Sequence, residues 1–547
     1  MPTALIFSLV AVGAELPLGQ GVGFPLPLTA AQPFVHCVGM TQRTSRLLLV
    51  VAAMSVPWPA LAEGRGLVTW GDLGDGRYRN PILKADYSDP DVIRVGDDFY
   101  LVASEFHFMG IQVLQSTDLV NWKIISQVFH HLPISPKYDE MRGYAEGTWA
   151  PSLRYHDGEF YLFVCTPKDG LFMWHTKDPA GRWSDVVTVR ATAGWEDPCP
   201  FWDDDGQAYL LRGRTGAGPL ILHKISADGT RLLDDGVTIY TGPVAEGPKL
   251  FKRNGFYYIT HPEGGVATGW QAVERSKNLY GPYERRIVLA GGPHQGSIVE
   301  LPNGEAWFIG FKSTGWLGRV CYLEPVTWGD DNWPVFGDKG QPVDIWKKPA
   351  VAHSSPVGRP QTSDEFDSGA LNPIWQWNHN PVDDAWSLSA HPGFLRLNAL
   401  PADDIARARN TLTQKLWDEF GTIEIRLDLA GMAEGQKVGL AFFSGPVFTW
   451  AGAEKTADGC RVAWQNGTGA FIKDCRELWL RGDYSQGEAR LSYSADGRAW
   501  SDTTQRIALR FGAWKGARFG VFCYGPRPGY ADLDYVHYDY WSAAQPK

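Results

Sequence analysis

A glycine turn followed by aromatic and apolar residues recurs five times along the chain. It occurs as VGDDFYLVAS at 95–104, YHDGEFYLFV at 155–164, DDDGQAYLLR at 203–212, KRNGFYYITH at 252–261 and LPNGEAWFIG at 301–310. The successive glycines are 62, 48, 49 and 49 residues apart. Each occurrence is typical of a β-hairpin, and no helical pattern of useful length interrupts the series. Five β units of about 50 residues predict a five-bladed β-propeller over residues 78–345.

The remaining part of the chain has a different pattern. A proline-bearing stretch, KKPAVAHSSPVGRPQTSDEF, begins at Lys347 and predicts a linker over 346–362. Beyond it apolar residues alternate strictly, as in GTIEIRLDLA at 421–430, which is the period of a strand with one buried face. KVGLAFFSG and GARFGVFCYG predict further strands. Residues 363–547 are therefore predicted to form a β-sandwich, and the whole chain to be all-β.

The composition narrows the class of partner. A formal net charge of −10 argues against nucleic acid. The 24 tryptophans supply large flat rings, which suit propeller cores and also the CH faces of sugars.

The residues ahead of each repeated turn are candidates for chemistry. Counting back seven to ten residues from the five glycines gives Asp89, Trp149, Asp197, Glu246 and His294. The innermost strand of every propeller blade lines the central axis, so equivalent positions in the blades converge. We expect three carboxylates, a tryptophan and a histidine at one end of the channel.

Three carboxylates in an aromatic pocket suit glycoside hydrolysis. One must be ionised to activate water and one protonated to help the leaving group depart, and a third raises the pKa of the acid by like-charge repulsion. The alternative explanation for the acids is a calcium ion that plugs the channel, because carboxylates and carbonyls bind calcium.

Several motifs resemble glycoside hydrolase family 43 over about Asn80 to Trp333. They are NPIL, YSDPDVIRVGDDFYLVAS, GTWAPSLRYHDGEFYLF, EDPCPFWDDDG, EGPKLFKRNGFYYI and LGRVCYLEPVTW. The resemblance implies a five-bladed propeller of inverting hydrolases that act on β-xylosides, α-L-arabinofuranosides and related sugars. EGGVATGWQ at 263–271 most resembles the xylosidase and arabinofuranosidase branch, whereas FHFMGIQVL lacks the proline of the commoner family version.

The same resemblance assigns roles to the residues. It implies that Asp89 is the general base, Glu246 the general acid and Asp197 the residue that tunes the pKa of Glu246. The residues that it implies line the sugar pocket are Trp149, Phe106, His294 and Arg319. No cofactor or catalytic metal is expected, although a structural calcium in the channel near His294 is an alternative.

The second domain resembles the concanavalin A-like C-terminal domain of many β-xylosidases. Its implied role is to close one side of the active-site funnel, and carbohydrate binding is the alternative. The sequence thus predicts an inverting exo-acting hydrolase that releases terminal β-D-xylosyl or α-L-arabinofuranosyl groups from hemicellulose oligosaccharides. The alternatives are an endo-arabinanase and a propeller lectin without catalysis.

The first residues predict export. Residues 40–62, MTQRTSRLLLVVAAMSVPWPALA, have the basic, apolar and small-residue regions of a secretory signal peptide. We expect a start at Met40, with 1–39 assigned in error, a mature chain beginning near Glu63 and a secreted or periplasmic protein. A membrane anchor is the alternative, but the apolar run is shorter than the roughly 20 residues that a span requires.

Six cysteines follow this leader, at positions 165, 199, 321, 460, 475 and 523. They form no CxxC motif, which argues against a zinc site. Cys460 and Cys475 are the best candidates for a disulfide across one hairpin, and buried free thiols are the alternative.

Overall fold

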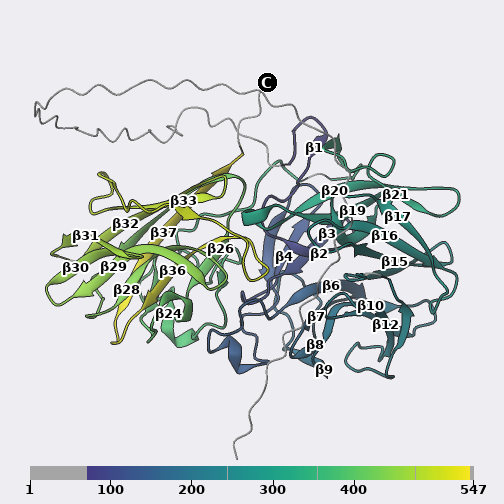
Figure 1. Ribbon diagram of the computed structural model, residues 1–547, viewed down its shortest axis with the longest axis horizontal. Helices are drawn as coiled ribbons and strands as arrows, with labels where there is room; N and C mark the ends of the chain where they lie inside the picture. The colour runs from purple at the N-terminus through teal and green to yellow at the C-terminus, as the bar shows by residue number, and fades with distance from the viewer. Residues whose placement is uncertain (1–70, 243, 354, 475, 543–547) are drawn as a thin grey trace, which may run out of the picture. The chain divides into compact units, whose positions relative to one another are not determined.

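The computed structural model describes residues 71–242, 244–353, 355–474 and 476–542. Within these residues, five four-stranded antiparallel sheets follow one another along the chain, each with its strands in sequence order. They are the blades of the propeller, coloured purple to teal in Figure 1. The predicted all-β class and five-bladed propeller are confirmed. The predicted signal peptide at 40–62 lies outside the described residues.

The blades are built from these strands. Blade one contains β2 (Ser88–Val95), β3 (Asp98–Ser104), β4 (Gln112–Ser116) and β5 (Lys123–Gln127). Blade two contains β6 (Trp149–His156), β7 (Glu159–Thr166), β8 (Gly170–Thr176) and β9 (Val187–Ala191). Blade three contains β10 (Trp195–Trp202), β11 (Ala208–Arg214), β12 (Leu220–Ile225) and β13 (Val237–Tyr240). Blade four contains β14 (Lys249–Arg253), β15 (Phe256–Glu263), β16 (Trp270–Ser276) and β17 (Glu284–Leu289). Blade five contains β18 (His294–Glu300), β19 (Ala306–Ser313), β20 (Arg319–Trp328) and β21 (Pro334–Phe336).

The repeated glycines form the turn between the first and second strand of each blade. Gly96, Gly158, Gly206, Gly255 and Gly304 have φ of 63°, 86°, 80°, 75° and 88°. A backbone with positive φ favours glycine because a Cβ atom would crowd the neighbouring carbonyl. This shared requirement explains why the glycine repeats once per blade.

The chain ahead of β2 pairs with the last blade. Leu83 forms a β-bridge with Cys321, and the backbone N–H of Ile82 donates to the carbonyl of Cys321 at 2.9 Å. The Asn80 side chain donates to the carbonyls of Leu323 and Val343, both at 2.9 Å. These contacts join the first and last parts of the propeller and close the ring.

Two larger sheets form the β-sandwich, which also confirms the prediction. A seven-stranded sheet has the order β23 (Gln376–Trp377), β26 (Leu412–Lys415), β36 (Arg518–Tyr524), β28 (Lys437–Ser444), β29 (Val447–Thr456), β30 (Gly459–Trp464), β31 (Gly467–Ile472). An eight-stranded sheet has the order β24 (Trp386–Ser387), β25 (Leu395–Asn398), β37 (Tyr530–Trp541), β27 (Phe420–Asp428), β32 (Glu477–Ser485), β33 (Glu488–Ser494), β34 (Ser501–Asp502), with β35 (Ile507–Ala508) also on β33.

The remaining elements are short. β1 (Arg77–Arg79) pairs with β22 (Ile345–Lys347). The 3₁₀ helices are η1 (Pro136–Tyr138), η2 (Gly315–Leu317), η3 (Asp383–Ala385) and η4 (Ile405–Arg407). No helix among the described residues is long and apolar enough to cross a membrane.

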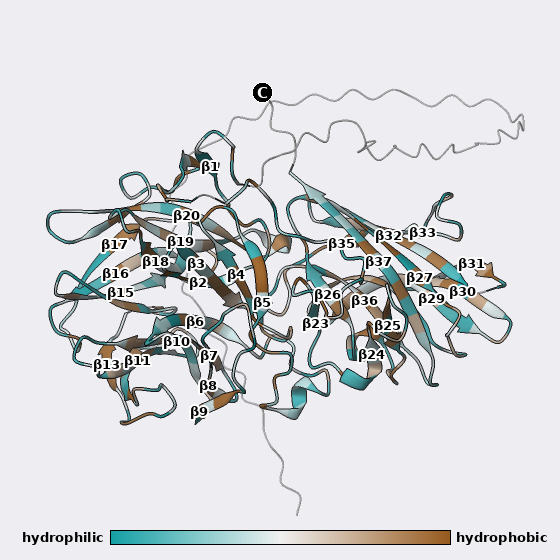
Figure 2. Ribbon diagram, turned by 180° about the vertical axis from the view of Figure 1, so that it is seen from behind, coloured by the Kyte–Doolittle hydropathy of each residue, from teal (hydrophilic) through white to brown (hydrophobic). Residues whose placement is uncertain are grey.

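Alternation along the sandwich strands determines which face is buried. In β27 Ile423, Ile425 and Leu427 are buried, whereas Glu424 and Arg426 between them are partly exposed. Strands such as β37 show the corresponding hydrophobic and hydrophilic bands in Figure 2. Because side chains alternate between the two faces of a strand, this pattern directs the apolar face of the sheet into the core.

Five of the six cysteines that follow the leader lie in the described residues. Cys165, Cys199, Cys321 and Cys523 are buried free thiols, and Cys460 is disulfide-bonded. Cys475, the partner that the sequence favoured, lies outside the described residues.

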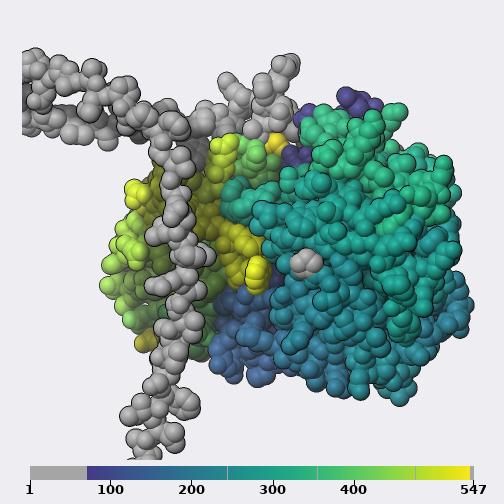
Figure 3. All heavy atoms as spheres, turned by 45° about the vertical axis from the view of Figure 1, so that its right-hand side comes forward, coloured from purple at the N-terminus to yellow at the C-terminus, as the bar shows by residue number. Residues whose placement is uncertain are grey.

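A buried charged network connects the propeller to the sandwich. Lys415 and Arg518, from the sandwich, bind Glu105 of the propeller at 2.6 and 2.8 Å. Lys515 binds Asp86 at 2.9 Å. All five side chains are at most 4% exposed. In the space-filling view, yellow residues near the C-terminal end border the teal surface of the propeller (Figure 3). A buried ion pair is stable only when its geometry is good. This network therefore favours one position of the sandwich loop around Lys515.

Candidate active site

The innermost strand of every blade begins with the same backbone kink. The kinked residues, with φ between 35° and 55°, are Asp89, Ala150, Asp197, Gly247 and Gln295. Proline follows in the first four blades and glycine in the fifth. In four blades the pairing with the second strand also shifts across the kink, as in a β-bulge. A bulge changes the direction of the side chains beside it, and in these four blades it does so at one end of the channel.

The candidate residues were expected at equivalent positions in the blades, and the structure corrects this expectation. Asp89 and Asp197 occupy the kinked position itself, whereas Trp149, Glu246 and His294 occupy the position before it. The interval from the kink to the hairpin glycine varies from seven to nine residues between blades. Counting back from the glycine therefore mixed two adjacent positions.

One cavity collects most of the predicted site residues. Its volume is about 230 Å³. Among the residues that line it are Asp89, Asp197, Glu246, Phe106, Trp149 and Arg319. The structure thus brings six of the seven predicted residues together from blades one to five.

Asp89 is oriented from both sides. Its Oδ1 accepts a hydrogen bond from Arg319 Nη1 at 2.9 Å, and its Oδ2 accepts one from Ser104 Oγ at 2.6 Å. The Ser104 oxygen in turn accepts from the backbone N–H of Ala150 at 2.6 Å. A guanidinium and a hydroxyl compensate the burial of this carboxylate and hold its plane.

Glu246 and Asp197 lie in a strongly acidic environment. Burial, together with the charges of Asp197 and Asp89, raises the pKa of Glu246 to about 8. Burial and the charge of Asp89 raise the pKa of Asp197 to about 6, although Asp197 Oδ2 accepts from the N–H of Gly247 at 2.7 Å. Glu246 is therefore protonated at neutral pH, which is the state that a general acid needs.

Aromatic rings form the walls of the cavity. Phe106 and Trp149 are 5.6 Å apart in an edge-to-face arrangement, and Trp149 and Trp514 are 6.1 Å apart. Trp514 belongs to the sandwich, and its ring also lies 5.8 Å from the Arg319 guanidinium. The second domain thus contributes a side chain to the cavity. Flat apolar rings beside carboxylates suit the alternating CH and OH faces of a sugar.

Glu196 and Trp514 are among the lining residues that were absent from the sequence-based set. Glu196 lies directly before Asp197. An alignment of the blades on Pro198 and Pro248 would have given it the position equivalent to that of Glu246. Trp514 could not have been found in this way, because it lies in a loop of the other domain and belongs to no repeat.

His294 lies outside the residues that line the cavity. It is buried, its Nδ1 is 3.1 Å from the carbonyl of Gly292, and its ring is 5.0 Å from that of Phe311. Its Nε2 has no hydrogen-bond partner among the described residues. A role for His294 in sugar binding stays a prediction.

Three clusters in the described part of the chain have side chains that could hold a metal ion. They are His130–His131–Asp383, His261–Glu263–Glu274 and Glu196–Asp197–Glu246. In the second, Arg285 already pairs with Glu263. None of the three contains His294, so the suggested calcium near this residue stays a prediction.

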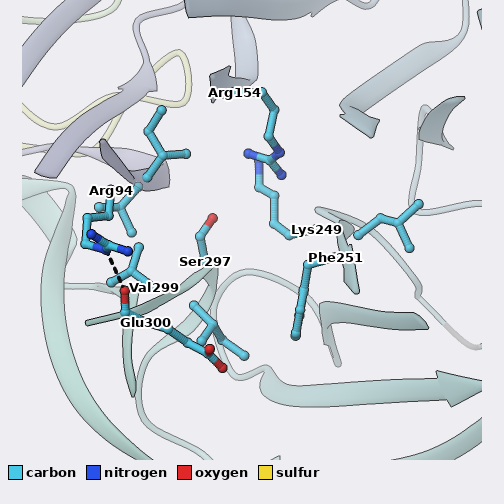
Figure 4. A pocket seen from close by; sticks show the side chains of 11 residues that line it. Arg94, Arg154, Lys249, Phe251, Ser297, Val299 and Glu300 are labelled. Carbon is cyan, nitrogen blue, oxygen red and sulfur yellow. Dashed lines mark hydrogen bonds between the residues drawn. The ribbon is translucent and has the colours of Figure 1, made fainter. Parts of the chain in front are cut away.

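Beneath the acids the channel is filled by charged side chains. Asp91 accepts from the N–H of Leu153 at 2.7 Å and from Arg154 Nη1 at 2.8 Å, and Lys249 Nζ lies 3.6 Å from it. Beyond this level a second cavity, of about 260 Å³, opens at the inner strands. Figure 4 shows Arg154, Lys249 and Ser297 pointing into it.

Sequence profiles of known families match both domains. The profile "Glycosyl hydrolases family 43" matches residues 78–334. The profile "Beta xylosidase C-terminal Concanavalin A-like domain" matches residues 363–539.

Curated proteins similar to this chain span most of its length. A "Putative beta-xylosidase" of Xylanibacter ruminicola is 47% identical over 82% of this chain and 87% of its own. A "Beta-xylosidase" of Formosa agariphila is 34% identical over 86% of this chain and 92% of its own. A "Non-reducing end alpha-L-arabinofuranosidase" of Bacteroides ovatus is 33% identical over 65% of this chain and 69% of its own.

Solved structures superpose on most of the length of this chain. The GH43 protein BlXynB of Bacillus licheniformis superposes with a TM-score of 0.74 at 27% identity, over 84% of this chain and 99% of its own. The GH43B protein of the Bacteroides ovatus xyloglucan locus gives a TM-score of 0.74 at 26% identity, over 85% and 99%.

Proposed function

Because the chain belongs to glycosyl hydrolase family 43, we propose that its cavity is the active site of an inverting, exo-acting glycosidase. Its substrates are terminal β-D-xylosyl and α-L-arabinofuranosyl groups on hemicellulose oligosaccharides. The observation that carries the proposal is the set of three carboxyls, Asp89, Asp197 and Glu246, around one aromatic cavity.

The residues have distinct roles in this proposal. Asp89, held by Arg319 and Ser104, accepts a proton from the attacking water. Glu246, protonated at neutral pH, gives its proton to the leaving oxygen. Asp197 holds the pKa of Glu246 high by its charge, and it positions the backbone of Gly247 next to the acid. Inversion requires about 6.5–9.5 Å between base and acid, so that a water fits beside the sugar.

The small size of the cavity and the contribution of Trp514 to its lining support exo action. About 230 Å³ lies below the roughly 300–1,000 Å³ of sites for drug-sized ligands, and suits a single sugar ring. Trp514 of the sandwich covers part of the wall. An endo-arabinanase needs an open cleft across the channel, so this alternative is not favoured. A lectin would have no use for a protonated glutamate among carboxylates.

The relatives carry both pentose names, and we propose that both sugars are accepted. We also propose that the enzyme is exported, on the basis of the signal-peptide pattern at 40–62. It needs no cofactor in this mechanism, since water, an acid and a base complete the reaction.

The test is hydrolysis of 4-nitrophenyl β-D-xyloside and α-L-arabinofuranoside, measured side by side. Asp89→Asn should lower kcat by at least about 10³-fold, because the base would be lost. Asp97→Asn makes the same change at an exposed turn of the same blade and should keep full activity. Proton NMR should show α-xylose first from a β-xyloside. Release of the β-anomer first, or no hydrolysis of either pentoside, would contradict the proposal.

A further inference from the structure

We propose that Glu196 is a fourth functional carboxyl of the active site, a positioning residue that takes the first negative charge of its pair with Glu246 as the pH rises toward about 8, so that the proton stays on the general acid. This inference rests on the proposed function, because it assumes that Glu246 donates a proton.

Glu196 occupies the position in blade three that Glu246 occupies in blade four. Each glutamate comes directly before the kinked residue of its blade, Asp197 or Gly247, and is followed two residues later by proline. The neighbouring kinks therefore direct both side chains toward the same end of the channel. The carboxyl oxygens of Glu196, Asp197 and Glu246 come within 4.8 Å of one another. Glu196 is 4% exposed and lines the cavity.

Two backbone donors hold the Glu196 carboxyl. The N–H of Gly216 donates to Oε2 at 3.3 Å, and the N–H of Ala217 donates to Oε1 at 2.9 Å. Both donors belong to residues with left-handed φ, 94° and 57°. Successive N–H groups in such a turn form a concave site that favours an anion. The described residues provide no such donor to Glu246.

This difference in hydrogen bonding favours ionisation of Glu196 before Glu246. Burial raises the pKa of both side chains to about 8, and the charge of Asp197 contributes in each case, while the charge of Glu246 adds to the rise at Glu196. Two acids this close titrate as a pair, in which the first ionisation opposes the second. The backbone donors stabilise negative charge on Glu196, so the proton that stays bound longer is the one on Glu246.

The expected size of the effect follows from the separation. Unit charges about 4.8 Å apart interact by more than one pKa unit at an effective dielectric constant of about 20. We therefore expect removal of the Glu196 charge to lower the pKa of Glu246 by about one unit. The protonated fraction of Glu246 at about pH 8 would then fall about fivefold, whereas at about pH 5.5 it would barely change.

The experiment measures kcat/KM against pH for Glu196→Gln and the parent enzyme, with xylobiose and with a dinitrophenyl pentoside. With xylobiose the alkaline limb should move down by about one pH unit relative to the acid-side plateau of the same variant. With the dinitrophenyl leaving group, which needs little protonation, the shift should disappear. The matched control is Glu324→Gln, because Glu324 is also a buried acid whose pKa burial raises to about 8, but it lies on β20 and does not line the cavity.

A purely structural role predicts a different result. If Glu196 only ties down the 214–218 turn, Glu196→Gln lowers kcat/KM equally at both pH values and with both substrates, and the proposal is wrong. If this variant does not fold, Glu196→Asp replaces it: this variant keeps the charge and should keep the alkaline limb within about 0.3 pH unit. A full one-unit shift in Glu196→Asp would refute the proposal. An inactive parent enzyme would instead refute the proposed function.

Discussion

Lys515 is the residue whose replacement tests how the sandwich is held against the active site. Its ammonium is 1% exposed and lies 2.9 Å from Asp86 Oδ2 and 3.5 Å from Glu105 Oε2. It also donates to the carbonyl of Ser104 at 2.9 Å. Lys515→Met keeps most of the side-chain volume and removes only the charge and its hydrogen bonds.

The cost can be estimated from what each partner retains. Glu105 keeps Lys415 and Arg518, so it stays paired. Asp86 keeps only neutral donors, among them the N–H groups of Arg319 at 2.9 Å and Gly516 at 3.0 Å. Removing one partner of a buried ion pair costs about 3–5 kcal/mol. Because Asp86 keeps those donors, we expect the low end, about 3 kcal/mol.

The assay is urea unfolding followed by tryptophan fluorescence. With an m-value of about 3 kcal/mol per M, the midpoint should fall by about 1 M. Lys177→Met, at a lysine that is 80% exposed, is the control and should not move the midpoint. The double variant Asp86→Asn with Lys515→Met should recover about 2 kcal/mol relative to the sum of the single variants, since neither charge is then left unpaired.

The pH dependence gives a second check on the same reasoning. Burial tends to raise the pKa of Asp86, but Lys515 and the hydrogen bonds outweigh it and lower the pKa. A lowered carboxylate pKa stabilises the protein above the unfolded value, and this contribution is lost as the pH falls through the folded value. In Lys515→Met, burial should raise this pKa instead, so the stability deficit should shrink as the pH falls toward about 4. A midpoint unchanged at pH 7, or a deficit independent of pH, would refute the reasoning.

Four further predictions concern the site and the leader. Asp197→Asn should cut kcat by at least about 10²-fold on xylobiose and by less on a dinitrophenyl pentoside. It should also shift the limb of the pH–rate profile that reports the general acid. Equal losses on both substrates would exclude a role of Asp197 in tuning the pKa of Glu246. Glu246→Gln should stabilise the protein above about pH 5, by more than about 1 kcal/mol at pH 8, because the raised pKa of Glu246 costs stability once the unfolded chain has lost its proton; urea midpoints at two pH values check this. Trp514→Ala should raise KM about tenfold with less effect on kcat, whereas Phe471→Ala, at an exposed site of the sandwich, should leave KM unchanged. N-terminal sequencing of exported protein should find a start near Glu63, and a mature chain that retains residues 1–39 would contradict export through the predicted signal.

The sequence was most informative where a backbone requirement repeats. The hairpin glycines need positive φ, and the alternating residues of β27 need one apolar face, so both leave a visible pattern. Five turns and one alternating segment were enough to predict the propeller and the sandwich. The acids were recognised because Asp89, Asp197 and Glu246 come at similar distances from those glycines.

The rest depended on information that a linear pattern does not contain. The kink-to-turn interval differs between blades, so residue counting could not separate the kinked position from the one before it and passed over Glu196. Trp514 reaches the cavity only through the docking of a second domain, which is fixed by charges far apart in the sequence, such as Asp86 and Lys515. His294 matches the family pattern, yet it is not among the residues that line the cavity, and its Nδ1 lies 3.1 Å from the carbonyl of Gly292.

The five kinked residues share one backbone conformation but differ in their side chains. At each one the backbone geometry is set by the strand and by the residue that follows, which leaves the kinked side chain itself variable: aspartate twice, alanine, glycine and glutamine once each. A substitution at a kinked position can therefore change the functional groups in the cavity while the backbone of the blade stays the same. For engineering, Ala150 and Gln295 are the positions to vary: they line the cavity and already have the backbone conformation that carries the two aspartates, so an acid introduced there would need no rebuilt loop.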